Sequence, residues 1–263
     1  MNKNKYGPWV IVTGASSGIG KAFVEKIAAM GFNLIIVARN EDKLHQLKNS
    51  LIKHFQIGIK VLIADLTTEE GIHHVIKQTE ALEVGLLINN AGREDSNHFL
   101  EINKKDHTQT IDLNIKAPLL LAHHFGTKMA NRKRGGIINM SSIVAFQGVP
   151  YISNYAATKS YNLIFSEGLS AEFSKHNIDV LAVTPGFTAT NLASVYDFKG
   201  TPFKPLEPSF VVTEALNALG KKRVVIPGGI NKFLFLSGKF LFSRKLNTTS
   251  FGMVFKKVLR KIL

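Results

Sequence analysis

The 263-residue sequence contains no cysteine, which excludes disulfide bridges, a thiol nucleophile and any metal or iron–sulfur site held by cysteine. It also lacks a long apolar run. The stretch 233–242 is about half of the roughly 18 residues that a membrane span needs, and Lys239 interrupts it. The first residues carry no apolar segment that ends in a small-residue cleavage site. We therefore expect no spanning helix and no secretion, and we expect a cytoplasmic protein.

Acidic residues are absent after Glu214, whereas the same segment holds eleven lysines and arginines. The chain up to Glu214 has 22 basic and 19 acidic residues, so most of the net charge of +14 belongs to the C-terminal segment. Glycine and proline are scattered rather than clustered, which indicates that no linker divides the chain. We expect one globular domain whose basic charge acts through the C-terminal segment.

Short apolar runs alternate with longer amphipathic segments up to about residue 227. Helical spacing is clear in residues 21–30 and 42–55, among others. This alternation predicts an α/β fold with a doubly wound parallel sheet of about seven strands and helices on both faces. The predicted strands span residues 9–13, 33–38, 59–64, 86–89, 136–140, 178–184 and 223–226.

A glycine-rich turn follows the first predicted strand and opens a helix. Glycine lets the backbone come close to a pyrophosphate, and the free N–H groups at the positive end of the helix attract its charge. Alone, such a turn also fits a plain strand-to-helix connection, but its place after the first strand favours dinucleotide binding by a Rossmann-like sheet. The candidate binding residues in this turn are Gly14, Ser16, Ser17, Gly18, Ile19 and Gly20.

The end of the second predicted strand indicates which dinucleotide binds. It reads Val37-Ala38-Arg39-Asn40 and lacks the carboxylate that would bind the ribose 2′-hydroxyl of NAD(H). The forked guanidinium of Arg39 suits a 2′-phosphate instead. We therefore favour NADP(H) over NAD(H), with a solvent-facing arginine at a strand end as the alternative.

Tyr155 and Lys159 lie one helical turn apart in a helical segment, so their side chains project from one face. An ammonium beside a phenol lowers the phenol's pKa from about 10 toward the range that is useful for proton transfer. Ser142, just after the fifth predicted strand, carries a hydroxyl that can orient and polarise a substrate carbonyl. We expect Tyr155 to be the acid/base group, although each residue taken singly also fits a surface or helix-capping role.

The chain resembles the short-chain dehydrogenase/reductase family from residue 10 to about residue 190, because its motifs occur in that family's order and approximate spacing. The resemblance implies hydride transfer between a nicotinamide and a carbonyl or secondary alcohol. It also implies that Lys159 holds the nicotinamide ribose and that Asn114 anchors a water in the proton path. The matching motifs are Thr13–Gly20, Asp65-Leu66, Asn89-Asn90-Ala91-Gly92, Asn114, Ser142, Tyr155 with Lys159, and Pro185-Gly186.

The resemblance implies three further groups of cofactor contacts. They are Asp65 and Leu66 at the adenine, Asn90, Ala91 and Gly92 as a backbone wall, and Pro185, Gly186 and Thr188 as a cradle for the nicotinamide. No metal is expected, because the histidine pairs 73–74 and 123–124 point to different sides of a helix and the sequence has no HExxH motif.

Residues from about 187 to 210 stand where the family places a lid over its substrate, and three prolines make this segment loop-like. Its apolar residues either line a site for a hydrophobic substrate or only pack the lid. These residues are Leu192, Tyr196, Phe198 and Phe203.

We assign residues 1–227 to a dinucleotide-binding catalytic domain and residues 228–263 to a basic amphipathic extension that matches no motif of the family. In the last predicted helix, apolar residues repeat at helical spacing and basic residues take the opposite face. The apolar face packs on the body or on a partner subunit, or it binds an anionic membrane surface; nucleic acid is not expected. The apolar residues are Phe251, Val254, Phe255, Val258, Leu259 and Ile262, and the basic residues are Lys256, Lys257, Arg260 and Lys261.

The sequence thus predicts an NADP(H)-dependent oxidoreductase with a small-molecule carbonyl or alcohol substrate. From the resemblance we expect a homodimer or homotetramer that associates through the helices of residues 99–132 and 153–175. One alternative is a dinucleotide-sensing or scaffold protein with the same fold, which would not require the intact Ser142, Tyr155 and Lys159. The other is a reductase for acyl chains on a carrier protein, whose acidic surface the basic extension would attract.

Overall fold

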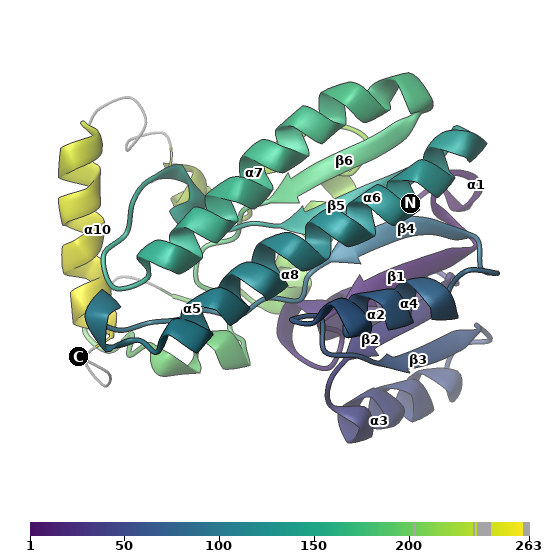
Figure 1. Ribbon diagram of the computed structural model, residues 1–263, viewed down its shortest axis with the longest axis horizontal. Helices are drawn as coiled ribbons and strands as arrows, with labels where there is room; N and C mark the ends of the chain where they lie inside the picture. The colour runs from purple at the N-terminus through teal and green to yellow at the C-terminus, as the bar shows by residue number, and fades with distance from the viewer. Residues whose placement is uncertain (202–203, 234, 236–242, 260–263) are drawn as a thin grey trace.

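Seven parallel strands form one sheet in the order β3-β2-β1-β4-β5-β6-β7. The computed structural model describes residues 1–201, 204–233, 235 and 243–259 (Figure 1). All seven predicted strands are present, and the predicted α/β architecture is confirmed. The strands are β1 (Trp9–Thr13), β2 (Asn33–Ala38), β3 (Ile59–Ile63), β4 (Val84–Asn89), β5 (Gly135–Met140), β6 (Ile178–Val183) and β7 (Val224–Val225).

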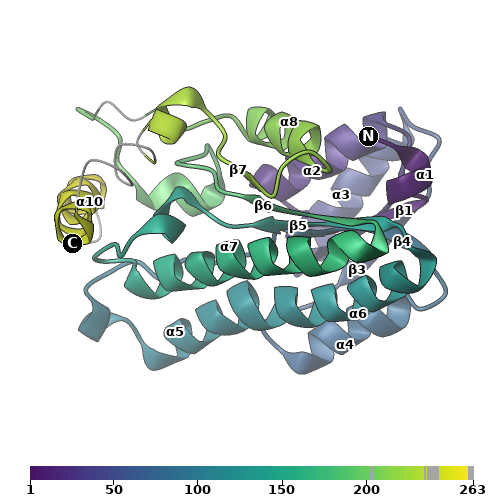
Figure 2. The ribbon, with the colours of Figure 1, turned by 90° about the horizontal axis from the view of Figure 1, so that it is seen from above.

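Helices cover both faces of this sheet, with α2, α3 and α8 on one side and α4, α6 and α7 on the other (Figure 2). The long helices are α2 (Gly18–Ala29), α3 (Glu41–Ile52), α4 (Glu69–Gln78), α5 (Lys104–Ile111), α6 (Ala117–Arg132), α7 (Ser153–Phe173), α8 (Pro208–Ala218) and α10 (Arg244–Val258). The short ones are α1 (Lys3–Tyr6), the 3₁₀ turns η1 (Phe99–Glu101), η3 (Ile143–Phe146), η4 (Ser174–His176) and η5 (Asn191–Val195), and the π-helical turn η2 (Asp112–Lys116).

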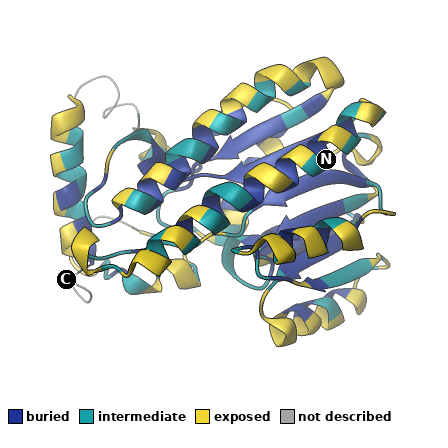
Figure 3. Ribbon diagram, viewed as in Figure 1, coloured by how far each residue is buried: buried dark blue, intermediate teal, exposed yellow. Residues whose placement is uncertain are grey.

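Each face of the sheet has its own hydrophobic core. Strand residues that alternate along β1, such as Val10 and Ile11, point into opposite cores and are fully buried. The strands are therefore apolar along nearly their whole length, as expected for a parallel sheet that is covered on both sides. Figure 3 shows the buried sheet between helices that expose one side to solvent.

Local sequence signals explain where several helices begin. The Asn40 side chain accepts a hydrogen bond from the Lys43 backbone N–H at 2.9 Å and caps α3. Thr68 caps α4 through the Gly71 N–H at 3.0 Å. Both helices carry two acidic residues in the first turn, which the positive end of the helix favours.

The strand order reverses at β1, whose neighbours are β2 and β4. In doubly wound sheets the loops on the two sides of such a point run in opposite directions and leave a crevice at the carboxyl ends of the strands. The loops that follow β1, β2, β3, β4, β5 and β6 all contribute to a pocket at that edge.

Helix α10 lies beyond the carboxyl ends of the strands, away from both layers of helices (Figures 1 and 2). Its apolar side chains Phe251, Val254, Phe255 and Val258, with Leu259, pack into a cluster with residues 143–156 and 187–198. Of the two alternatives for this face, the structure shows packing on the protein's own body. Lys256 and Lys257 are exposed on the opposite side.

Some residues named in the sequence analysis lie outside the described residues. They are Phe203, Lys239, Arg260, Lys261 and Ile262. In the part of the chain that the structure does describe, no helix combines the length and the apolar character needed to cross a bilayer.

Candidate active site

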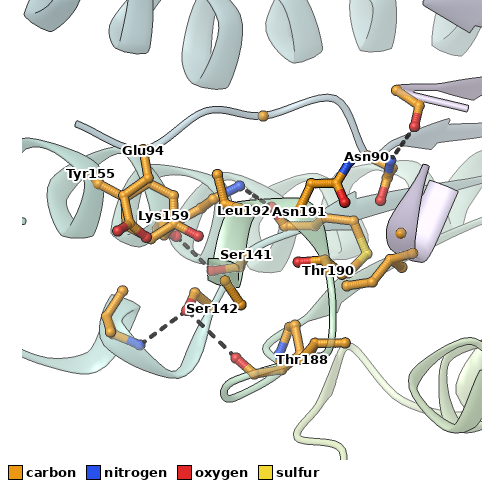
Figure 4. A pocket seen from close by; sticks show the side chains of 18 of the residues that line it. Asn90, Glu94, Ser141, Ser142, Tyr155, Lys159, Thr188, Thr190, Asn191 and Leu192 are labelled. Atoms are coloured by element: carbon orange, nitrogen blue, oxygen red, sulfur yellow. Dashed lines mark hydrogen bonds between the residues drawn. The ribbon is translucent and has the colours of Figure 1, made fainter. Parts of the chain in front are cut away.

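A pocket of about 750 Å³ lies at the carboxyl ends of the strands (Figure 4). The glycine-rich turn forms one end of this pocket, and Ser142, Tyr155 and Lys159 stand on its wall. The lid and α10 supply the remaining wall through residues such as Leu192, Phe251 and Phe255.

The glycine-rich turn needs glycine at three of its positions. Gly14 and Gly18 have φ angles of +66° and +53°, in the left-handed region that side chains disfavour. At Gly20, a Cβ atom would lie 2.2 Å from the Gly14 carbonyl oxygen and 2.5 Å from Asn90 Nδ2. Gly20 therefore does not line the pocket but lets α2 pack closely behind it. Of the six residues predicted for this turn, those on the pocket are Gly14, Ser16, Ser17, Gly18 and Ile19.

The loop after β4 holds the glycine-rich turn in place. Asn90 Nδ2 donates to the carbonyl oxygens of Thr13 at 2.9 Å and Gly14 at 3.3 Å. The hydroxyl oxygen of Thr13 accepts hydrogen bonds from the N–H groups of Asn90 and Ala91, both at 3.0 Å. Asn90, Ala91 and Gly92 line the pocket as expected, and the Asn90 side chain also shapes the turn, which the sequence did not reveal.

Arg39 and Asp65 lie close together where the loops after β2 and β3 line the pocket. Arg39 Nη1 lies 3.9 Å from Asp65 Oδ2, and both side chains are well exposed. The other oxygen of Asp65 accepts hydrogen bonds from the N–H and hydroxyl groups of Thr67 at 3.0 and 2.9 Å, which fixes the carboxylate. The guanidinium is therefore open to a further anion. Leu66 lines the same part of the pocket.

Ser142, Tyr155 and Lys159 come together from two elements. Ser142 follows β5 at the N-cap of η3, where its Oγ donates to the Pro185 carbonyl oxygen at 3.5 Å and accepts from the Val144 N–H at 3.4 Å. Tyr155 and Lys159 lie on successive turns of α7, and both are buried. Lys159 Nζ stands 5.5 Å from the centre of the Tyr155 ring and donates to the Met140 carbonyl oxygen at 2.9 Å.

The expectation that Lys159 lowers the pKa of Tyr155 is wrong for this structure. Burial raises the pKa of Tyr155 above its ordinary value, and the Glu94 carboxylate adds to this, while the hydrogen bond to Ser142 acts in the opposite direction. Burial also lowers the pKa of Lys159 to about 8, against the effect of Glu94. The free protein therefore holds Tyr155 as a neutral phenol, the form that can donate a proton.

Asn114 lies in the π-helical turn η2 between α5 and α6 and is almost fully buried. Its side chain accepts from the Arg93 N–H at 3.0 Å and donates to the Arg93 carbonyl oxygen and to Thr158 Oγ1, both at 2.9 Å. Its backbone carbonyl oxygen accepts from Asn162 Nδ2 at 2.9 Å. Asn114 thus ties the loop after β4 to α7 from behind the pocket rather than lining it.

The segment after β6 follows the pocket as predicted, with Pro185, Gly186 and Thr188 on its wall. The Pro185 carbonyl oxygen accepts from the Ile143 N–H at 2.9 Å, and Thr188 Oγ1 donates to the Gly186 carbonyl oxygen at 3.0 Å. The first bond holds this segment against the loop that carries Ser142, and the second lies within the segment.

Two contributions to the pocket were missed in the sequence. Glu94 lines it next to the catalytic candidates, and an acid two residues past the Asn-Asn-Ala-Gly motif was the signal that could have found it. The C-terminal helix also lines it, through Asn247, Ser250 and Val254 as well as its phenylalanines. Helical spacing showed that this helix has an apolar face but not which surface that face covers.

Comparison with known proteins agrees with this architecture. The family model described as short chain dehydrogenase matches residues 8–197. The chain therefore belongs to the short-chain dehydrogenase family and is an oxidoreductase of the class that acts on CH–OH and C=O groups.

Particular relatives extend this similarity over most of the chain. A 7β-hydroxysteroid dehydrogenase of Mediterraneibacter gnavus is 32% identical over 235 residues, which cover 88% of this chain and 89% of that protein. A very-long-chain 3-oxoacyl-CoA reductase of Mus musculus is 32% identical over 211 residues, 79% of this chain and 67% of that protein. The solved structure of a short-chain dehydrogenase from Sphingobium yanoikuyae in complex with NADPH is 30% identical, covers 93% of this chain and 95% of that one, and has a TM-score of 0.79.

Proposed function

We propose that the protein is an NADP(H)-dependent oxidoreductase that interconverts a hydrophobic ketone and its secondary alcohol, with Tyr155 as the acid/base group. The observation that carries this proposal is the meeting of Ser142, Tyr155 and Lys159 on the wall of a pocket whose far end is the glycine-rich turn. A bound nicotinamide supplies the hydride for the carbonyl carbon, or accepts it from the alcohol.

In the reducing direction, Tyr155 donates its phenolic proton to the carbonyl oxygen as the carbon becomes an alcohol. The hydroxyl of Ser142 stands close enough to affect the phenol, so it can donate a hydrogen bond to the same oxygen. Lys159 lies one turn behind Tyr155, with Nζ 5.5 Å from the centre of its ring, and we assign it to the ribose of the nicotinamide. A proton from solvent then restores the phenol, and oxidation of the alcohol reverses each step.

The residues at the glycine-rich turn fit a dinucleotide. Ser17, the N-cap of α2, makes no side-chain capping bond, so the first N–H groups of this helix are left for an anion such as a pyrophosphate. The close approach at Gly14 and Gly18 leaves no room for side chains where the phosphates would lie. We assign the adenine end to Arg39, Asp65 and Leu66 and the nicotinamide end to Pro185, Gly186 and Thr188, with Lys159 on the ribose.

Arg39 supports NADP(H) as the cofactor, because its exposed guanidinium has one weak ion pair and can bind a 2′-phosphate. The similar protein from Sphingobium yanoikuyae was solved with NADPH, which agrees with this choice.

The wall opposite the cofactor supports a hydrophobic substrate. Phe187, Tyr196, Phe198 and Phe255 form an aromatic cluster in which adjacent ring centres lie 4.9 to 6.1 Å apart. All of these rings except that of Phe198 line the pocket. The relatives named above act on a steroid and on long acyl chains, both of which are large and apolar. We propose a substrate of that kind, either a bulky ketone or a 3-oxoacyl compound.

The sensing or scaffold function stays the alternative from another class. To distinguish them, NADPH is mixed with the protein and with a panel of bulky ketones, 3-oxoacyl thioesters and carrier-bound acyl groups, and the absorbance of the reduced nicotinamide is followed. Turnover that Ser142→Ala slows at least tenfold supports the enzyme. Binding of NADPH without turnover of any carbonyl supports the sensor.

The proposal also includes the domain bounds, the oligomeric state and membrane binding. Residues 1–227 form the catalytic domain, with a lid at about 187–210, and residues 228–263 form the extension. Exposed apolar side chains on α6 and α7, including Leu119, Leu120 and Ile164, support a homodimer or homotetramer through these helices, which light scattering tests. Exposed lysines on the extension support binding of a cytoplasmic form to anionic membranes, and co-sedimentation with anionic vesicles tests this.

A further inference from the structure

Tyr155 lies in the first turn of α7, at the end of a helix, where helices fray. The N-cap residue is Ile152, whose apolar side chain offers no acceptor to the free N–H groups of this turn. Proton transfer needs the phenol at a defined place, because a misplacement of about 1 Å can cost about a hundredfold in rate. Contacts from outside α7 must therefore hold its first turn.

Asn154, the residue before Tyr155, joins this turn to two other elements. Its Nδ2 donates to Asp95 Oδ2 at 2.8 Å, on the loop between β4 and η1. The same Nδ2 donates to the His107 carbonyl oxygen at 3.2 Å, in α5. The amide of Asn154 therefore connects the first turn of α7 to both the loop and α5.

The carboxylate of Asp95 is held in one place. Its side chain is only 2% exposed, and its Oδ2 also forms a hydrogen bond with His107 Nδ1. The His107 ring stacks in turn on Phe99, with ring centres 4.7 Å apart. A buried carboxylate requires such partners, and the positive end of α7 also favours a carboxylate beside it. Asp95, His107 and Asn154 thus form one connected group, which we call the Asp95 cluster.

A second contact supports the same join. The Asn97 N–H donates to the Tyr151 carbonyl oxygen at 3.0 Å, and the rings of His98 and Tyr151 meet edge to face, with centres 5.3 Å apart. Among the described residues that line the pocket, none belongs to the Asp95 cluster. The cluster can therefore act on the reaction only through the residues that it holds.

We propose that Asn154 is a positioning residue, whose hydrogen bond to Asp95 fixes the first turn of α7 and with it the place of the Tyr155 hydroxyl in the pocket. The glycine-rich turn, which we assign to the cofactor, forms the other end of the pocket. Loss of the bond should therefore slow the chemical step without weakening NADPH binding. This inference rests on the proposed reductase function.

The test measures hydride transfer from NADPH to a bulky ketone in a single turnover. The rate is expressed per NADPH-binding site, so that a loss of folded protein does not lower it. Asn154→Ala removes the amide and leaves the bond between His107 and Asp95. Asp95→Ala removes the acceptor, and Asp95→Asn restores an oxygen at the place of Oδ2. Among the described residues Asp95 Oδ1 has no hydrogen-bond partner, so the new amide nitrogen can take its place without the loss of a bond.

The matched control is Asn103→Ala at the N-cap of α5. It removes a side-chain hydrogen bond of the same length, from the Lys105 N–H to Asn103 Oδ1 at 2.8 Å. The loss of this cap lowers stability but leaves the Asp95 cluster intact, so the rate of hydride transfer should stay that of wild type.

We expect Asn154→Ala and Asp95→Ala to slow hydride transfer about ten- to a hundredfold, with the Kd of NADPH within about twofold of wild type. Asp95→Asn should recover most of the rate lost in Asp95→Ala, because His107 and Asn154 regain their acceptor. If Asp95→Ala does not fold, Asn154→Ala decides, since Asn154 is only partly buried and alanine suits a helix.

Two results overturn the inference about Asn154 and leave the reductase intact. One is a rate in Asn154→Ala equal to that of Asn103→Ala, and the other is a loss in Asp95→Asn as large as in Asn154→Ala. Wild-type protein that binds NADPH and reduces no ketone of the panel overturns the proposed function itself.

Discussion

Replacement of Phe255 tests whether α10, which forms part of the pocket wall, can detach while the sheet stays folded. Its ring is 3% exposed and packs against Phe187 and Tyr196 of the lid. Helix α10 lies outside the sheet, and two hydrogen bonds join it to the lid. They run from the Asp197 N–H to the Val258 carbonyl oxygen and from Lys257 Nζ to the Gly200 carbonyl oxygen, both at 2.8 Å. The helix can therefore open without unfolding the sheet.

Replacing a buried phenylalanine with alanine costs about 3 to 5 kcal/mol in a core. We expect Phe255→Ala to lose about 3 kcal/mol of the free energy that docks α10, which raises the population of the open helix roughly hundredfold. Most of the apolar wall is then lost, so KM for a hydrophobic substrate should rise while the Kd of NADPH changes little.

Hydrogen exchange measures this opening residue by residue. In Phe255→Ala the amides of α10 should exchange about a hundred times faster, whereas the amides of β5 keep their protection. Met253→Ala, on the exposed side of the same helix, is the matched control and should change the exchange rates of neither α10 nor β5. Faster exchange in β5 as well as α10 would refute the reasoning, because Phe255 would then stabilise the whole fold.

Three further predictions concern the cofactor and the buried amine. Arg39→Ala should weaken NADPH binding about ten- to a hundredfold and leave NADH binding nearly unchanged, as measured by fluorescence titration. Gly20→Ala should lower both NADPH affinity and the free energy of unfolding, by about 1 to 3 kcal/mol for the latter, because the new Cβ meets the Gly14 carbonyl oxygen at 2.2 Å. Its control is Gly168→Ala in α7, where no heavy atom lies within 4 Å and alanine should stabilise the helix by up to about 1 kcal/mol. Because burial lowers the pKa of Lys159 from 10.5 to about 8, the unfolded chain binds more protons between these pH values, and stability from this group rises with pH. Denaturant titrations should therefore show that the free energy of unfolding of wild type, relative to that of Lys159→Met, increases by up to about 3 kcal/mol between pH 8 and 10.5. No increase would contradict the argument that burial lowers the pKa of Lys159.

The sheet and the order of its elements could be predicted because each strand is a short apolar run with a clear boundary. β1 and β2 have the predicted bounds, whereas β7 is only Val224–Val225, because pairing with β6 rather than apolar character decides where an edge strand ends. The ordered motifs also predicted which loops meet at the pocket.

The chemistry between these residues could not be predicted in the same way. Spacing along α7 showed that Tyr155 and Lys159 share a face, but their pKa values depend on burial and on Glu94, which comes from a loop some sixty residues earlier in the chain. The role of Asn90 in bracing the glycine-rich turn is likewise a long-range hydrogen bond. Likewise, periodicity marks the apolar face of α10 without indicating that the lid covers it.

We infer that Tyr155 transfers the proton and that NADPH binding does not depend on its hydroxyl group. A single-turnover measurement of NADPH oxidation, with enzyme in excess over a bulky ketone, tests this in Tyr155→Phe. We expect the rate of hydride transfer to fall about 10²- to 10⁴-fold with the Kd of NADPH within about twofold of wild type. The control is Tyr161→Phe, which removes a hydroxyl further along the same helix. Hydride transfer in Tyr155→Phe at the rate of the control would contradict the account.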